Sequence, residues 1–85
     1  MFPIFNYTMS DTTLRDLVPG ETATIVALHT EEPLYQRLLA LGFRVGKAVE
    51  LIRLAHFSGP LQVRVGTTDI LMRRAEAGKI SVSRR

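Results

Sequence analysis

The sequence contains no cysteine and no tryptophan. Without cysteine the chain can form neither a disulfide nor a thiolate zinc site, which are two common ways to stabilise a small domain. No apolar run approaches the roughly 20 residues that a membrane-spanning helix requires, so we expect no direct membrane insertion. The first residues also lack the basic region and long apolar run of an export signal. These absences together predict a cytoplasmic protein.

Motifs of catalysis are missing as well. The sequence has no Gly-x-Ser-x-Gly, no His-Glu-x-x-His and no phosphate-binding glycine loop, and it offers no cysteine nucleophile. We therefore predict that the chain is not an enzyme and requires no cofactor. A function that rests on binding is the remaining class.

The composition is that of one small, basic, packed domain. A length of 85 residues suits a single domain, and a hydrophobic content of 46% favours a packed core over disorder. Eleven basic residues face eight acidic ones, which gives a net charge of +3. Adjacent basic residues occur only at Arg73-Arg74 and Arg84-Arg85, so a solvated surface is favoured over a nucleic-acid interface. A small basic barrel that binds phosphates through these four arginines is kept as an alternative.

Alternating apolar residues predict a β domain. Ala23, Ile25 and Ala27 alternate with polar or β-branched residues between Glu21 and His29, and Leu61, Val63 and Val65 do the same. Further strands are predicted around Val49 and Leu51, at Ile70–Met72 and at Lys79–Ser83, with short helical pieces at Thr13–Leu17 and Ala75–Gly78 and a three-residue turn at Gly66–Thr68. About five short strands joined by tight turns predict a small closed barrel without exposed edges.

One short helix is predicted at Pro33–Leu41, after the first strand. Acidic residues followed by Pro33 mark its start, and Gly42 marks its end. Leu34, Leu38 and Leu41 recur at helical spacing and are expected to face the core.

The apolar stripe of this helix is wider than a small barrel can cover. We expect Tyr35 and Leu39 to stay partly exposed beside the core-facing residues, and we expect Arg37 to flank them. The predicted partner-binding residues are Leu34, Tyr35, Arg37, Leu38, Leu39 and Leu41. The alternative is that the five apolar side chains simply fill an open end of the barrel.

Residues 1–8 are predicted to be an N-terminal extension of a domain that spans residues 9–85. Met9-Ser10-Asp11 would itself make a plausible start of the domain. The extension carries Phe2, Ile4, Phe5 and Tyr7, so we expect it to pack on the barrel or on a neighbouring subunit, which makes a homodimer through this segment a candidate assembly.

His29 and His56 are the only histidines. A metal site needs several converging donors, and the other candidates are acids such as Glu31, Glu32 and Asp69. We expect no more than adventitious binding of a divalent metal such as zinc through His29 or His56. A metal-binding or metal-sensing module is a further alternative function.

The segment Arg37–Gly46, together with the closing pattern Ala77-x-x-Ile80-x-Val82, resembles the FeoA family of bacterial ferrous iron uptake. The resemblance runs from about Thr13 to Val82. The sequence departs from the family pattern at Met72, where leucine is usual, and at Arg44-Val45, which replaces a more usual proline before the glycine.

This resemblance implies an SH3-like barrel and an accessory role. The implied partner is the cytoplasmic GTPase portion of a FeoB-type transporter, which would recruit the chain to the inner face of the membrane and be modulated by it. The resemblance does not imply a polyproline ligand, because only Tyr35, Phe43 and Phe57 could line an aromatic groove within the domain. Because the arginines are scattered and form no dense basic stripe, no nucleic-acid partner is expected.

Overall fold

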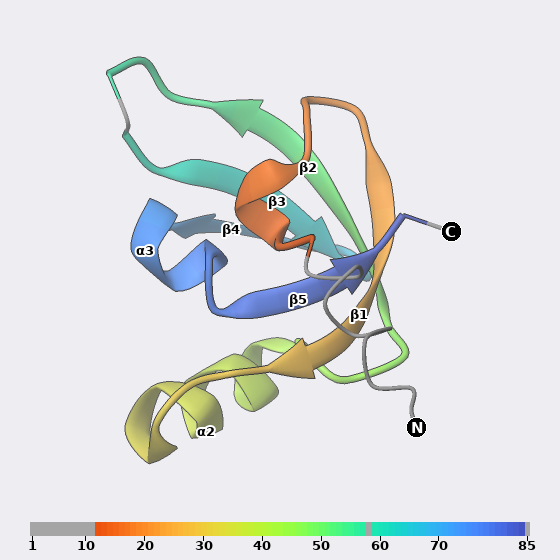
Figure 1. Ribbon diagram of the computed structural model, residues 1–85, viewed down its shortest axis with the longest axis vertical. Coiled ribbons are helices and arrows are strands. Elements are labelled where there is room, and N and C mark those ends of the chain that lie inside the picture. Colours follow the sequence, from red (N-terminus) through yellow and green to blue (C-terminus); the bar gives the residue numbers. More distant parts are fainter. Residues whose placement is uncertain (1–11, 58, 85) are drawn as a thin grey trace, which may run out of the picture.

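The structure is a computed structural model that describes residues 12–57 and 59–84. Five strands, two α-helices and one 3₁₀ helix follow one another along the chain (Figure 1). Their bounds are η1 Leu14–Asp16, β1 Thr22–Leu28, α2 Glu32–Leu41, β2 Ala48–Leu54, β3 Leu61–Val65, β4 Thr68–Met72, α3 Arg74–Ala77 and β5 Ile80–Ser83. The predicted order of strand, helix, three strands and final strand is confirmed. The predicted N-terminal extension lies outside the described residues.

All five strands form one antiparallel sheet in the order β4-β3-β2-β1-β5. The pairing register shifts between Ile25 and Ala27 on β1 and between Leu51 and Arg53 on β2. Such irregularities increase the bend and twist of a strand. The sheet curls around a single core as a result (Figure 1). A mainly β fold with one helix after the first strand is confirmed.

The prediction of a closed barrel without edges is wrong. β4 and β5 are the two outer strands of the sheet and do not pair with each other. The segment before η1 lies along the outer edge of β5 instead, where Thr13 forms a bridge with Ser81 and the Val82 N–H donates to the Thr12 carbonyl at 2.8 Å. β4 has no strand neighbour on its outer edge among residues 12–57 and 59–84.

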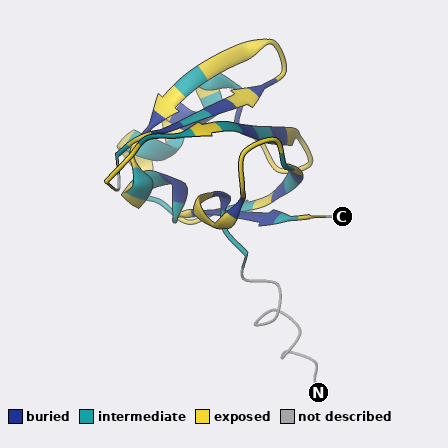
Figure 2. Cartoon of the chain, turned by 90° about the horizontal axis from the view of Figure 1, so that it is seen from above, coloured by how far each residue is buried: buried dark blue, intermediate teal, exposed yellow. Residues whose placement is uncertain are grey.

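The core is built from the inward positions of the strands and from the helices. Buried residues occur on the strands and on the helices that surround it (Figure 2). Ala23 and Ile25 are buried whereas Val26, the next residue along β1, is exposed, as the alternation predicts. The fully buried large side chains are Leu14, Leu17, Ile25, Leu38, Phe43, Val49, Leu51, Leu61, Val63, Ile80 and Val82.

The turn between β3 and β4 is one residue shorter than predicted. Val65 pairs with Thr68, which leaves only Gly66 and Thr67 in the loop. Gly66 has a φ of +62°, and the first position of a two-residue hairpin loop commonly needs such a positive value. The short loop also determines which backbone groups of β4 face its outer edge.

Candidate functional site

The candidate site is α2, the helix that connects β1 to β2 along the chain. It lies at one end of the molecule (Figure 1). The helix begins at Glu32, one residue earlier than predicted, with Pro33 in its first turn. It ends at Gly42, whose φ is +104°. The Gly42 N–H donates to the Leu39 carbonyl at 3.0 Å and the Phe43 N–H donates to the Leu38 carbonyl at 2.9 Å. This pair of hydrogen bonds is a Schellman C-cap, so Gly42 ends the helix as predicted.

The C-cap positions the residues that attach α2 to the sheet. Leu38 and Phe43 are 1% and 0% exposed, and they supply the apolar contact that accompanies a Schellman cap. Leu34 and Leu41 are partly buried and pack against the same core. The prediction that Leu34, Leu38 and Leu41 face the core is confirmed.

Tyr35 and Leu39 lie on one flank of α2 and are half-buried. They therefore keep part of their surface accessible, and their role in binding a partner stays a prediction. The predicted binding set also includes Leu38, but its side chain is in the core and can only support the surface from beneath. We call Tyr35 and Leu39 the outer flank of α2.

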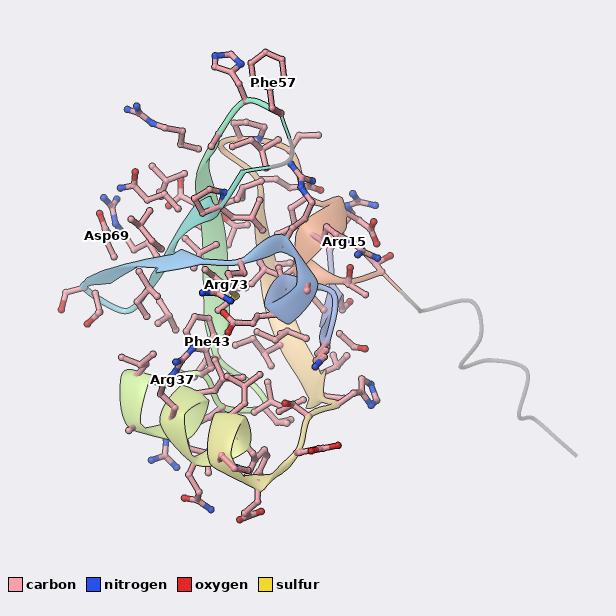
Figure 3. All side chains as sticks on the ribbon, turned by 90° about the vertical axis from the view of Figure 1, so that its left-hand side faces the viewer. Arg15, Arg37, Phe43, Phe57, Asp69 and Arg73 are labelled. Carbon is pink, nitrogen blue, oxygen red and sulfur yellow. The ribbon has the colours of Figure 1, made fainter. Side chains whose placement is uncertain are left out.

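Arg37 does not flank Tyr35 and Leu39 as predicted. Residues two positions apart on a helix are separated by more than half of a 3.6-residue turn, so Arg37 projects from the opposite side. There its Nη2 donates to Glu76 Oε2 of α3 at 3.1 Å, and the Arg37 side chain remains 60% exposed (Figure 3). Arg37 thus connects the two helices and does not contribute its charge to the outer flank of α2.

The two histidines do not share a site. His29 follows β1, and its Nε2 lies 3.0 Å from the Ser81 hydroxyl. His56 lies in the turn after β2, with its ring centroid 6.2 Å from that of Phe57. Because β1 and β2 are antiparallel, these two positions are at opposite ends of the sheet. Within the described part of the chain, no three His, Asp or Glu side chains are grouped to hold a metal ion. Adventitious zinc binding stays a prediction.

The arginines considered for nucleic-acid binding do not gather either. Arg73 and Arg74 precede β5 and Arg84 follows it, at the other end of the strand. Arg84 is already engaged, because its Nε donates to Glu21 Oε2 at 2.6 Å and its Nη2 donates to the Asp16 carbonyl at 2.9 Å. The Val18 N–H and Arg84 together hold the pKa of Glu21 below its ordinary value. Arg84 therefore belongs to a local ion pair. Arg85 lies outside the described residues.

A second surface, which the sequence reasoning did not identify as a site, lies at the outer edge of β4. Leu71 is 72% exposed there. It borders a groove of about 550 Å³ whose walls include Gly59, Pro60 and Arg73. Leu71 alternates with the partly buried Ile70 and the buried Met72, so its side chain lies on the outer face of the sheet, next to the open edge.

Comparison with protein families gives a match over nearly all of this structure. The model of the FeoA domain family matches residues 12–84. A putative Fe(2+) transport protein A of Campylobacter jejuni is 32% identical over 71 residues, which cover 84% of this chain and 96% of the relative.

Two further relatives are a fusion protein and a solved structure. A fusion of Fe(2+) transport protein A with the Fe(2+) transporter FeoB, from Porphyromonas gingivalis, is 30% identical over 69 residues. The match covers 81% of this chain, which spans only 8% of the fusion protein. The crystal structure of Stenotrophomonas maltophilia FeoA complexed with zinc, described as a prokaryotic SH3 domain protein, has a TM-score of 0.72 at 30% identity. It matches over 85% of this chain and 89% of that one, which confirms the SH3-like fold class.

Proposed function

Because the chain belongs to the FeoA family and so takes part in ferrous iron transport, we propose that it binds the cytoplasmic GTPase portion of a FeoB-type transporter and modulates transport. The observation that carries this proposal is the Porphyromonas gingivalis relative, in which an FeoA segment and FeoB are parts of one chain. Fusion keeps two interacting parts at a high effective concentration. A separate protein of the same family must reach the same partner through an interface of its own.

The outer flank of α2 is the surface that we assign to this interface. Tyr35 and Leu39 are held firmly, because Leu38 and Phe43 beneath them are buried and the helix is capped at Gly42. A rigid aromatic residue beside an aliphatic one suits the centre of an interface, where tyrosine is enriched and charged residues are depleted. Arg37 lies outside this centre, on the side of α2 that contacts α3.

The proposal places the chain at the cytoplasmic face of the membrane through its partner. None of the described helices is long and apolar enough to cross a membrane. The chain contributes no catalytic step in this proposal and acts by changing the GTP turnover or the transport rate of the transporter.

Co-purification with the full-length transporter in detergent, with and without guanine nucleotide, tests the interface. We expect Leu39→Glu to weaken binding at least about tenfold, because a charge at the centre of an apolar contact must be desolvated. Ala40→Glu is the matched control, since it adds the same charge at the exposed neighbouring residue. Thermal melts of both variants verify folding. Equal binding by Leu39→Glu and by the unmodified chain would exclude the outer flank of α2 as the interface.

A further inference from the structure

The outer edge of β4 offers unpaired backbone groups. The two-residue loop makes Val65 and Thr68 a hydrogen-bonded pair, so the next such pair is Val63 with Ile70. Asp69 and Leu71 alternate with the residues of these pairs, and their backbone N–H and C=O groups point away from β3. The edge can therefore accept another strand.

Side chains on the solvent side of this edge follow a simple order. Asp69, Leu71 and Arg73 alternate with inward-facing Ile70 and Met72, and Arg73 continues the extended conformation with φ −71° and ψ 149°. The order along the edge is therefore negative, apolar and positive. Leu71 is 72% exposed between the two charges.

The two charges differ in how they are engaged within the chain, because Asp69 is already in an ion pair with Arg64. Asp69 accepts hydrogen bonds from Arg64 Nε at 2.6 Å and Arg64 Nη2 at 3.0 Å, and Arg64 lowers the pKa of this carboxyl, so Asp69 is ionised at neutral pH. Gln62 Nε2 also donates to this carboxylate at 3.5 Å, which leaves one of its about four lone-pair sites for a further donor. The Arg73 guanidinium forms no ion pair with the described residues and borders the groove beside Pro60.

We propose that the β4 edge binds the β4 edge of a second copy of this chain, antiparallel about a two-fold axis at Leu71. The order of charges is self-complementary under this rotation. Leu71 then faces Leu71 of the partner subunit, and Asp69 faces Arg73 of the partner subunit on both sides of the axis. The two leucines exchange the backbone hydrogen bonds of the contact, because the Arg73 N–H already donates to Glu76 and the Arg73 carbonyl accepts from Ala77 within each chain.

The predicted dimer is a weak one. Opposite charges on facing strands stabilise a pair, whereas like charges directly opposite each other destabilise it. The contact is an isologous two-fold interface of a few residues, which is smaller than a standard stable interface. It uses β4 and leaves the outer flank of α2 accessible, so it stands independently of the proposed transporter binding.

Sedimentation equilibrium of the full chain, at concentrations from about 10 μM to 1 mM, measures the dimer. Asp69→Arg places arginines opposite each other at both ends of the contact, and Arg73→Asp does the same with aspartates. We expect each variant alone to weaken dimerisation at least about tenfold. Arg64→Ala is the matched control, because it breaks the same ion pair within the chain but keeps the charges of the contact.

An equimolar mixture of the two variants provides the decisive measurement. In the mixed dimer one copy carries arginine at both positions 69 and 73 and the other carries aspartate at both, so every facing pair is again attractive. We expect the mixture to dimerise within about threefold of the unmodified chain. Restoration also shows that both variants are folded. Leu71→Lys, which removes the central apolar contact, is expected to abolish the dimer alone and in mixtures.

Three results would overturn the proposal. The first is a chain that remains monomeric over the whole concentration range. The second is a dimer that is indifferent to Asp69→Arg, Arg73→Asp and Leu71→Lys, which would point instead to the N-terminal residues 1–8. The third is a mixture of the two charge variants that stays monomeric.

Discussion

The two α-helices both connect strands of one sheet, yet they differ in what they do with their surface. α3 has four residues, buries Ala77 completely and lies against η1. α2 has ten residues, buries Leu38 and leaves its outer flank half-accessible. β4 and β5 are the two outer strands and need a connection across the sheet, whereas the neighbouring antiparallel strands β1 and β2 could be joined by a tight turn. α2 exceeds the need of its connection, and this excess is where a binding surface can form without weakening the fold.

Replacing Phe43 by alanine has the largest expected effect, and it tests how firmly α2 is attached to the core. Phe43 is 0% exposed and follows α2 directly, so Phe43→Ala should lower the free energy of unfolding by about 3–5 kcal/mol. Urea denaturation measures the change. Phe57→Ala removes the same ring at a fully exposed position and should change stability by no more than about 0.5 kcal/mol. A Phe43→Ala loss below about 1 kcal/mol would mean that α2 is not anchored through this ring.

The glycines that end the two helices are expected to differ in how much stability is lost when each is replaced by alanine. Gly42 has a φ of +104°, so Gly42→Ala should destabilise the fold by about 1–2 kcal/mol. Gly78 after α3 has an ordinary φ of −68°, and an added Cβ would lie 3.1 Å from the Arg15 guanidinium. This flexible side chain can move, so Gly78→Ala should cost less than about 0.5 kcal/mol. Equal losses in thermal or urea unfolding would contradict the contrast between the two caps.

The ion pair between the helices gives the smallest effect. Arg37 and Glu76 are joined at 3.1 Å, but the Arg37 side chain is 60% exposed. We expect a coupling energy of about 0.2–1 kcal/mol, weakened by added salt. A double-mutant cycle of Arg37→Ala and Glu76→Ala is needed, because Glu76 also accepts the Arg73 N–H at 3.3 Å and its loss alone removes a cap. A coupling of zero would show that α2 and α3 are energetically independent at this contact.

Local patterns predict most of this fold. The alternation around Ile25 identifies β1, and the acids before Pro33 together with Gly42 place α2 within one residue. Both signals depend only on neighbours along the chain, because side-chain alternation and helix capping are local properties. For the same reason the burial of Leu38 and the partial exposure of Leu39 follow from their helical positions.

Local patterns do not predict features that depend on contacts between residues far apart in the sequence. β4 and β5 do not pair, and Thr12 and Thr13 lie along the outer edge of β5 instead. No local pattern pairs Thr13 with Ser81, which are far apart in the sequence. The partner of Arg37 depends likewise on where α3 lies. The exposed β4 edge, and with it the groove beside Leu71, follows only once the strand order is known.

The position of Thr12 beside Val82 has a consequence for how this fold can be joined to other polypeptides. Both ends of the described chain leave the molecule next to β5, and Arg84 is pinned there by Glu21 and the Asp16 carbonyl (Figure 1). A covalent tether at either end would therefore pull on the same side of the domain. α2 and the β4 edge would both lie away from the attachment. They would remain accessible to a polypeptide at the other end of the tether.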